Sequence, residues 1–458
     1  MSVTQKLAAW AAETPDIQDQ GAVDKARDAV LDTIGVMIAG APDQAAKRVR
    51  RAVALWGNGP ATVVGQTEKL AAPWAALANG TAAHVLDFDD SFSPVSGHSS
   101  AVMVPALLAL AEAEGVSGHA ILDAYVVGLE IQARIGQAVN VEHYKLGWHS
   151  TSTVATIGSA AGCARLLGLN VDGMRNAISI AVSTAAGSKR QFGTMAKPMH
   201  AGLAAKNAVM AASLAAAGIE ASEEPLDGMW GFRELYAGDA SPGFELAMET
   251  LGNPLAIEEF QLNVKVYPCC ASTHTSLDGL LALKAKNGFS ADDVDLIKTT
   301  VPPINFNNLM YADPKSEMEK RFSMQYCLST AVRNGEVVVS DFQPGGDMPN
   351  AVRNFMSKVE MIKDNKPDAN PAHPTHIEIK LRDGRTLTTE VDKQKGTKAF
   401  PLKEADYERK FLGCAATGLD QALAVDLHRA IMHLDEQVSI KQVMAPLRGL
   451  RGAAVTAE

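Results

Sequence analysis

The sequence predicts a mainly α protein, with one large all-helical domain and a smaller inserted α+β domain. Helical sequence rich in Ala and Gly fills the first half, β-forming residues begin near residue 265, and helical sequence returns after Pro401. We therefore expect residues 1–264 and 402–458 to form the helical domain and residues 265–401 the α+β domain. At 458 residues and 47% hydrophobic content, the chain can bury one large core or two domains.

The helical domain is predicted from segments in which apolar residues recur every three or four positions. In residues 22–40 the apolar stripe runs from Val23 to Ile38, and Gly40 follows as a helix terminator. Similar segments predict helices at residues 99–115, 118–139, 151–168, 173–187 and 200–218. Small Ala and Gly side chains let helix backbones approach closely, so we expect tight crossings and several nearly fully buried helices.

The inserted domain is predicted from clusters of β-forming residues. Strands are expected at residues 293–302, 375–381 and 386–391, and Arg382-Asp383-Gly384-Arg385 joins the last two as a hairpin. Helices are expected within this domain at residues 321–335 and 348–359, and after it at residues 402–415 and 419–435. Residues 444–458 are predicted to be a loosely held tail.

Composition excludes several classes of function. A net charge of −10 argues against nucleic-acid binding and against an anionic membrane surface, because both need a basic face. The first residues contain no apolar core long enough for a signal peptide, and no later stretch has some 18 uncharged apolar residues in a row. We therefore expect a cytoplasmic protein without membrane partners. Five cysteines with one adjacent pair indicate neither a disulfide framework nor a zinc site.

Chemistry-bearing residues are concentrated between Asp87 and His200. This stretch contains LDFDDSF, His98, HYKLGWHSTST and GTMAKPMHAG, which bring acid, imidazole and amine groups into Gly-flanked loops. The pattern favours proton chemistry on a small anionic substrate. Asp87, Asp89 and Asp90 also suggest magnesium, but Asp-rich metal motifs serve diphosphates, and the chain is only 5% aromatic. We prefer an interpretation without metal, in which Asp89 caps a helix and Asp90 is solvated.

Five segments together resemble the MmgE/PrpD family: LDFDD, GWHSTST, GTMAKPMHAG, KVYPCCASTH and FSMQY. The resemblance covers nearly the whole chain. It implies an all-helical domain built from both ends of the chain, a smaller α+β lid domain, a site between them, and a homodimer without metal or organic cofactor. The family includes 2-methylcitrate dehydratase, cis-aconitate decarboxylase and iminodisuccinate epimerase, so the implied substrate is a small di- or tricarboxylate.

The site residues follow from this resemblance and from the chemistry of the side chains. Lys197, placed between two helices, is the implied substrate-facing lysine; otherwise it is a solvated loop residue. His149 precedes a Ser/Thr run whose residues are typical helix N-caps. The free amides at a helix start bind anions and disfavour an imidazolium, so His149 is expected to lie there as a neutral ring. The alternative is a histidine that only packs or caps. Tyr144 is predicted to present a phenol to the opposite substrate face; otherwise it is an ordinary interface tyrosine. The other expected residues are Asp87, His98, Ser91 and His200.

The KVYPCCASTH segment departs most from the family pattern. Lys265 fits a carboxylate clamp, or else is a surface strand lysine. Cys270 stands where the decarboxylase carries a histidine, and a neutral thiol cannot act as a cationic donor. Tyr326 completes the set, whereas His274 is expected to pack or cap. Because LDFDD also differs from the dehydratases, the favoured function is epimerisation of an iminodisuccinate-like dicarboxylate, with a dehydratase or decarboxylase as the alternative.

Overall fold

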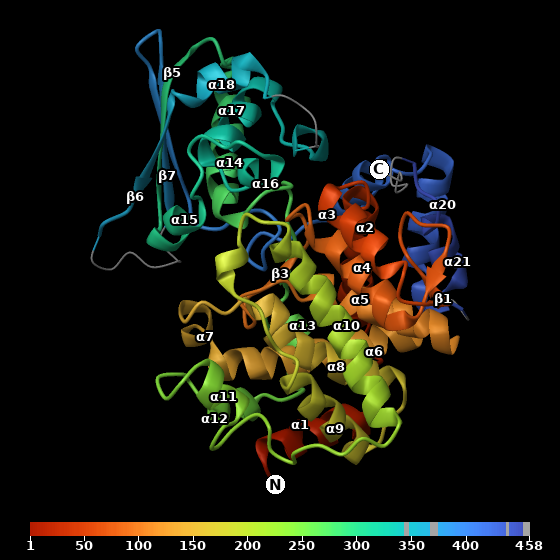
Figure 1. Cartoon of the computed structure of the whole chain (residues 1–458). Helices are drawn as coiled ribbons and strands as arrows, with labels where there is room; N and C mark the ends of the chain where they lie inside the picture. Colours follow the sequence, from red (N-terminus) through yellow and green to blue (C-terminus); the bar gives the residue numbers. More distant parts are fainter. Residues whose placement is uncertain (343–347, 367–373, 437–438, 452–458) are drawn as a thin grey trace. The chain divides into compact units, whose positions relative to one another are not determined.

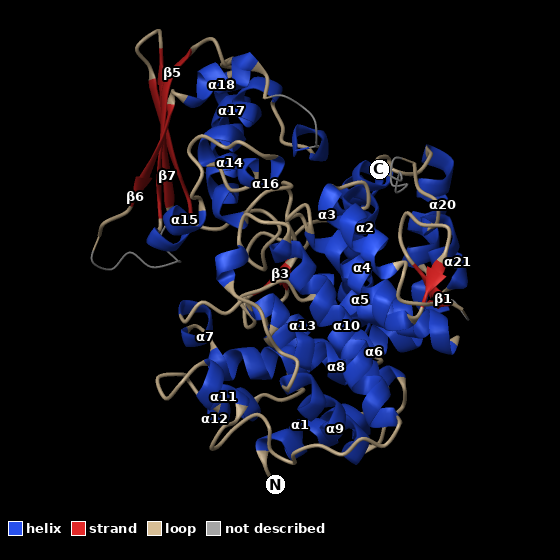
Figure 2. Cartoon of the chain, viewed as in Figure 1, coloured by secondary structure: helices blue, strands red, loops and turns tan. Residues whose placement is uncertain are grey.

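The computed structural model describes residues 1–342, 348–366, 374–436 and 439–451, and the chain divides into two compact units. Unit 1 comprises residues 1–85, 89–263 and 403–458, and unit 2 comprises residues 86–88 and 264–402. Helices dominate the cartoon in Figure 2, and the longest strands lie together in one small sheet. The mainly α fold is therefore confirmed.

Unit 1 is built largely from helices. These are α1 (Val3–Glu13), α2 (Gln20–Gly40), α3 (Gln44–Val53), α4 (Ala72–His84), α5 (Ser100–Glu114), α6 (Gly118–Val139), α7 (Glu142–Lys145), α8 (Val154–Leu166), α9 (Val171–Val182), α10 (Ala196–Ala216), α11 (Phe232–Tyr236), α12 (Phe244–Glu249), α13 (Ala256–Glu259), α19 (Glu404–Ala415), α20 (Gln421–Met432) and α21 (Lys441–Met444). Short 3-10 turns include η1 (Ser150–Ser152), η2 (Lys189–Gln191), η5 (Leu434–Glu436) and η6 (Ala445–Leu447).

The expectation that this part is entirely helical is wrong in detail. Strands β1 (Asn58–Thr62) and β2 (Lys69–Leu70) pair antiparallel, as do β3 (Ser91–Phe92) and β4 (Leu262–Asn263). These pairs are too short and too polar to show the alternating pattern by which a strand is recognised in a sequence.

The core of unit 1 confirms the expected close helix packing. Every residue of α5 from Ser100 to Glu112 is buried, and α10 packs along α4 (Figure 1). A Cβ atom built on Gly80 of α4 would lie 2.9 Å from the Cα of Gly202 in α10, and one on Gly202 would lie 2.2 Å from the carbonyl oxygen of Leu77. Only glycine at these positions allows the two backbones to approach so closely.

The segment after unit 2 returns to unit 1 and packs on α2. Phe411 of α19 lies against Gly35 of α2, where an added Cβ would be 3.2 Å from the Phe411 ring. Lys410 of α19 forms a buried ion pair with Asp32 of α2 at 2.6 Å. Beyond α21, Leu447 and Leu450 are buried and the Leu447 carbonyl accepts a hydrogen bond from Gly65. The predicted loose tail is therefore wrong for residues 444–451, because apolar burial holds them; residues 452–458 lie outside the described residues.

Unit 2 contains a four-stranded mixed sheet in the order β6-β5-β7-β8. Its elements are β5 (Val294–Val301), β6 (Val359–Lys363), β7 (Thr375–Leu381), β8 (Thr386–Val391), α14 (His274–Asn287), α15 (Pro303–Asn308), α16 (Glu317–Lys320), α17 (Met324–Asn334), α18 (Asn350–Met356), η3 (Ala271–Thr273) and η4 (Val339–Phe342). The predicted β7–β8 hairpin is present and antiparallel. β6 pairs parallel with β5 and was not predicted. Helices α14 and α17 contact one face of the sheet (Figure 1).

Candidate functional site

Four histidines, one aspartate and one lysine gather in unit 1. We call this group the histidine cluster: His84, Asp89, His98, His149, Lys197 and His200. The His84 ring centroid lies 4.5 Å from that of His98 and 5.8 Å from that of His149. Nδ1 of His149 lies 3.1 Å from Nδ1 of His200. The structure thus brings together four of the residues predicted from sequence, and adds His84 and Asp89, which were not predicted to act in the site.

Close backbone contacts explain why these residues meet. His84 ends α4 one turn after Gly80, and His200 lies two residues before Gly202 in α10, so both histidines stand close in the chain to the glycine contact between these helices. On the opposite side, a Cβ on Gly97 would lie 2.8 Å from the Thr151 amide. The His98 amide donates to Thr151 Oγ1 at 3.0 Å, which fixes His98 beside the turn that His149 begins.

Burial keeps most of these imidazoles neutral. It lowers the pKa of His84 to about 4, with Asp89 opposing and Lys197 reinforcing the shift. It also lowers the pKa of His149 well below its usual value, assisted by the positive charge of Lys197 and by the neighbouring histidines. The pKa of His200 falls for the same two reasons, burial and Lys197. At neutral pH these rings are therefore proton acceptors rather than cations.

Lys197 lies within a helix rather than in the predicted loop between helices. It is the second residue of α10, where Pro198 is tolerated because amides in the first helical turn have no intrahelical partner. Its side chain is buried, and Nζ lies 5.5 Å from the centroid of the Phe192 ring. The alternative of a solvated lysine is wrong, and the position supplies a fixed positive charge beside three histidines.

Asp89 and Asp90 are both buried, so the expected helix cap with a solvated neighbour is wrong. Oδ2 of Asp89 lies 2.8 Å from Nδ1 of His84 and 3.1 Å from Nδ1 of His98. The carboxylate of Asp90 instead accepts from the Ser100 hydroxyl, which lies 2.6 Å from the Tyr125 hydroxyl. Burial raises the pKa of Asp90 to about 7. The neighbouring residues Asp89 and Asp90 therefore contact different partners: two histidines for Asp89, and Ser100 for Asp90.

His84, Asp89 and His98 are the described residues that could share a metal ion, since their possible ligand atoms all lie within 4.8 Å of one another. A metal would need a lone pair on each coordinating nitrogen. Nδ1 of both rings instead lies within hydrogen-bond distance of the same carboxylate oxygen, and Nδ1 of His98 also lies 2.7 Å from the carbonyl oxygen of Asp90. These contacts fit N–H donors, and the trio therefore fits a hydrogen-bonded group better than a metal centre.

Tyr144 and Ser91 also lie in unit 1, where the structure shows them in other contacts. Tyr144 is a half-buried residue of α7, and its ring faces the Lys189 ammonium at 3.3 Å from the centroid. Lys189 Nζ also donates to the Tyr144 carbonyl at 3.2 Å. Ser91 begins β3, opposite Asn263. The roles predicted for these two residues stay predictions.

Unit 2 holds the remaining predicted residues, in two groups. In the first, the buried Lys265 lies 3.1 Å from Oδ2 of Asp87 and donates to the Asp87 carbonyl at 2.7 Å. The alternative of a surface lysine at position 265 is therefore wrong. Burial raises the pKa of the nearby Cys270, and the charge of Asp87 adds to this shift while that of Lys265 opposes it. Cys270 is accordingly a neutral thiol at pH 7 beside an ion pair.

In the second group, Tyr326 and His274 are packed into the interior of unit 2. The Tyr326 hydroxyl donates to the Asp341 carbonyl, and burial raises its pKa to about 12. The His274 ring packs edge-to-face on Tyr267 at 5.1 Å, and its Nε2 lies 3.2 Å from the Cys269 carbonyl oxygen. His274 thus packs, as expected. The Tyr326 hydroxyl satisfies a backbone group in this structure.

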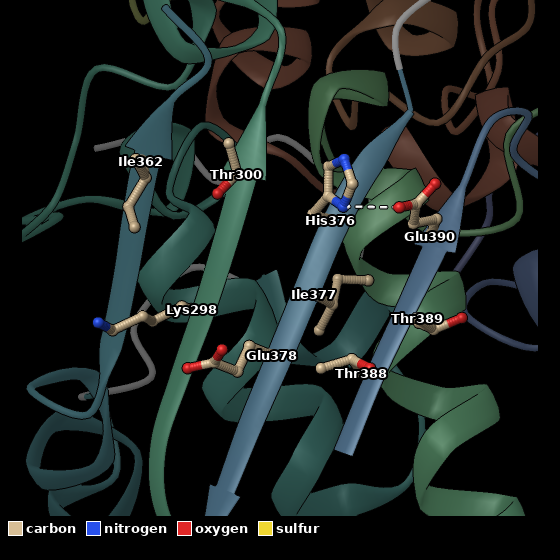
Figure 3. A pocket seen from close by; sticks show the side chains of 9 residues that line it. All are labelled: Lys298, Thr300, Ile362, His376, Ile377, Glu378, Thr388, Thr389 and Glu390. Carbon is tan, nitrogen blue, oxygen red and sulfur yellow. Dashed lines mark ion pairs between the residues drawn. The ribbon is translucent and has the colours of Figure 1, made fainter. Parts of the chain in front are cut away.

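A hollow of about 360 Å³ lies on the outer face of the sheet in unit 2 (Figure 3). Side chains from four strands line it, among them Lys298, His376 and Glu378, and His376 pairs with Glu390 at 3.1 Å. None of its lining residues was predicted to act in a site. Most of the residues that line the hollow are half-buried or exposed, with the buried Ile377 among them, and it lacks the buried acid–base groups of the histidine cluster.

Among the described residues, no helix is both long enough and apolar enough to span a bilayer.

Comparisons with known proteins identify relatives over nearly the full length. The family models for the MmgE/PrpD N-terminal and C-terminal domains match residues 5–245 and 267–435. A cis-aconitate decarboxylase of Homo sapiens is 30% identical, over 93% of this chain and 90% of the relative. The Mus musculus cis-aconitate decarboxylase is 29% identical over 94% and 90%, and that of Aspergillus terreus 24% over 96% and 95%. The chain belongs to the MmgE/PrpD family of enzymes.

Proposed function

We propose that this enzyme is a lyase that removes carbon dioxide or water from a small polycarboxylate, using only its own side chains as acids and bases. The observation that carries the proposal is the buried set of neutral imidazoles around Lys197. Both reactions need a group that accepts or delivers a proton at carbon, and fixed positive charge near the carboxylate oxygens, where negative charge builds up. The histidine cluster contains both kinds of group.

The chemistry can be written for either leaving group. In decarboxylation, the bond to the departing carboxylate breaks, its electron pair stays on the substrate carbon, and a protein acid delivers one proton there. In dehydration, a base takes a proton from carbon while an acid protonates the departing hydroxyl. His149 suits the base because burial keeps it neutral. Lys197 suits the group that stabilises the negative charge.

The relatives make cis-aconitate the first substrate to test. Relatives from two mammals and from Aspergillus are named cis-aconitate decarboxylases. They favour the lyase over the epimerase that the sequence alone favours. In other respects the proposal keeps the expectations from sequence. The enzyme uses no metal and no organic cofactor, and it is a homodimer located in the cytoplasm.

Cys270 keeps epimerisation of an iminodisuccinate-like dicarboxylate as a second candidate. Where the decarboxylase resemblance implies a histidine, this chain has a buried thiol whose pKa is raised. A neutral thiol donates only a weak hydrogen bond and cannot place a positive charge beside a carboxylate. The substrate of this enzyme is then expected to differ from cis-aconitate in the group that meets position 270.

Product analysis tests the proposal. Purified enzyme is incubated separately with cis-aconitate, 2-methylcitrate and iminodisuccinate in deuterium oxide, and the products are followed by proton NMR. Loss of carbon dioxide with deuterium at the new C–H position, or loss of water with a new vinyl signal, supports the lyase. Exchange of a C–H proton on iminodisuccinate, without net loss of carbon dioxide or water, would replace the lyase with the epimerase. If none of the substrates exchanges or converts, both candidates fail.

A further inference from the structure

Asp89 lies between two histidines in the histidine cluster. Its carboxylate is fully buried, and a single oxygen, Oδ2, lies 2.8 Å from Nδ1 of His84 and 3.1 Å from Nδ1 of His98. The three residues come from the end of α4 and from the segment between α4 and α5. This arrangement differs from a surface ion pair, because both the acid and His84 are almost completely removed from solvent.

The acceptors around Nδ1 determine which nitrogen carries the proton. The Asp90 carbonyl oxygen, 2.7 Å from Nδ1 of His98, can only accept a hydrogen bond, and the Asp89 carboxylate on the same nitrogen also accepts. A lone pair on this nitrogen would face two oxygens, so Nδ1 of His98 carries a hydrogen. The same argument gives Nδ1–H for His84, whose Nδ1 faces the Asp89 carboxylate. In the neutral form of each ring, Nε2 is then the acceptor.

The charges of the group agree with this assignment. Burial acts to raise the pKa of Asp89, but the interactions of its carboxylate with His84 and His98 hold it well below its usual value. Burial lowers the pKa of His84 to about 4. The pair at neutral pH is therefore an ionised Asp89 and a neutral His84. Nε2 of His84 is buried and has no hydrogen-bond partner among the described residues, which is costly for an acceptor unless a ligand or water supplies a proton donor.

We propose that Asp89 is a positioning residue that holds His84 and His98 as Nδ1–H tautomers, so that both rings present Nε2 as the proton acceptor. The inference deepens the proposed function and depends on it, because it assigns the roles of groups in the same cluster. Asp89 also stabilises the imidazolium that forms when either ring takes up a proton, as a buried carboxylate behind a catalytic histidine does.

The first test is the tautomeric state of the histidines in the wild-type enzyme without substrate. Nitrogen-15 NMR of histidine-labelled protein at pH 7 distinguishes Nδ1–H from Nε2–H, and His84→Gln and His98→Gln identify the signals by their disappearance. We expect both rings as Nδ1–H tautomers. An Nε2–H tautomer for either ring would overturn the proposal. This measurement needs no substrate, so it stands or fails independently of the proposed lyase activity.

The second test is Asp89→Asn, which keeps the shape of the side chain and removes its charge. We expect kcat to fall by at least ~100-fold with KM within a few-fold of wild type, because the substituted group acts through the histidines rather than on the substrate. The acidic limb of the pH profile of kcat/KM should move to lower pH, since the imidazolium loses its counter-charge. A purely structural role would lower the amount of folded enzyme without moving this limb.

Asp90→Asn is the matched control. Asp90 is the next residue and is equally buried. Its carboxylate accepts a hydrogen bond from Ser100, and only its backbone carbonyl contacts His98. We expect this variant to keep both tautomers and to retain kcat within about tenfold of wild type. Equal losses of kcat in the two variants, with an unmoved pH profile, would show that any buried carboxyl group at this place matters and would overturn the specific role of Asp89. If Asp89→Asn does not fold, the tautomers measured in the wild-type enzyme decide whether the proposal stands.

Discussion

At the scale of single residues, burial sets the chemistry of the site more than any ion pair does. His84 and His149 are almost completely buried, and burial is the largest cause of their lowered pKa values. The same burial would make an isolated lysine unfavourable, but Nζ of Lys197 lies 5.5 Å from the centroid of the Phe192 ring, whose face attracts a cation. The result is a mixture of neutral bases and one fixed cation at the same pH.

Replacing Lys197 or His149 tests whether catalysis needs both the cation and the neutral base. We expect Lys197→Ala and His149→Gln each to lower turnover of the accepted substrate by ~100-fold or more, the usual contribution of a general acid or base. Lys206→Ala is the control on the same helix: Lys206 lies 5.8 Å from the Trp74 ring and outside the histidine cluster. Steady-state kinetics, with circular dichroism to confirm folding, check the prediction. Near-normal turnover in Lys197→Ala would remove this residue from the chemistry.

A buried histidine outside the cluster gives a prediction about stability and pH. Burial lowers the pKa of His143 from 6.5 to about 4. Between these values the unfolded chain binds a proton that the folded protein does not, so the free energy of unfolding falls as the pH falls from 6.5 towards 4. The contribution of one such group is ~1.4 kcal/mol per pH unit.

His143→Gln should remove this contribution. Its hydrogen bonds to Tyr236 and Thr153 are lost, so the variant is less stable at pH 7, but its free energy of unfolding should fall less steeply on acidification than that of the wild type. Urea unfolding at pH 5 and pH 7 measures the two slopes. Parallel slopes would mean that His143 binds its proton equally in the folded and unfolded chain.

The residues of the site were predictable from sequence only in part. His98, His149 and His200 stand in Gly-flanked segments whose composition indicates function. His84 ends an Ala-rich helix, where its sequence surroundings resemble those of a packing residue. Asp89 was predicted to be a helix cap with a solvated neighbour. No local signal shows that two imidazoles from different segments supply the hydrogen bonds that allow Asp89 to be buried. That information resides in the packing of the helices.

At the scale of elements, the long helices were predictable because their periodic apolar residues leave few alternatives. Predicted residues 22–40 and 118–139 correspond to α2 and α6. Strand β6 was missed for a physical reason. Val352, Phe355, Met356 and Val359 have helical spacing and all four are buried, but the helix ends at Met356 and Val359 begins the strand. The spacing predicts a helix over residues 348–359 and could not show where the backbone changed conformation.

The contact between α4 and α10 gives a prediction at this scale. In Gly202→Ala the new methyl group would lie 2.2 Å from the Leu77 carbonyl, so the helices must separate. We expect a loss of ~1–3 kcal/mol in the free energy of unfolding, together with reduced turnover because His84 and His200 are carried on these helices.

Gly413→Ala in α19 is the control, since an added Cβ there meets nothing within 4 Å. It should be neutral or stabilise by ~0.4–1 kcal/mol, because alanine restricts the unfolded chain. Chemical denaturation and activity assays on both variants check the pair. Equal stability of the two variants would show that the close contact does not constrain the helices.

At the scale of the whole molecule, the chain forms two units, and each is assembled from separate segments. The segment 86–88 belongs with unit 2, although the rest of its loop belongs with unit 1. Asp87 in this segment pairs with Lys265, which is 178 residues later in the chain. A boundary drawn from composition cannot separate three residues from their neighbours, because such an assignment depends on contacts with residues far along the chain.

The whole enzyme is predicted to work without a metal. Nδ1 of His84 and His98 fits a hydrogen-bond donor rather than a ligand, so dialysis against EDTA should leave turnover unchanged. Activity before and after dialysis, with elemental analysis of the purified protein, checks this. Loss of activity that a divalent metal restores would reassign His84, Asp89 and His98 as ligands.

The packing of α19 on α2 has a consequence for the synthesis of the protein. The ribosome makes α2 in the first segment of unit 1 and α19 in its last segment, and residues 264–402 of unit 2 are made between them. Until the last segment emerges, Gly35 and its surroundings lack the Phe411 side chain, and the buried Asp32 lacks Lys410. Unit 2 can complete its sheet while the nascent chain is still growing, whereas unit 1 must wait until α19 has emerged and keeps an apolar surface exposed until then. The first part of the chain to be made is thus the last to be finished, and it is the part on which chaperones would act.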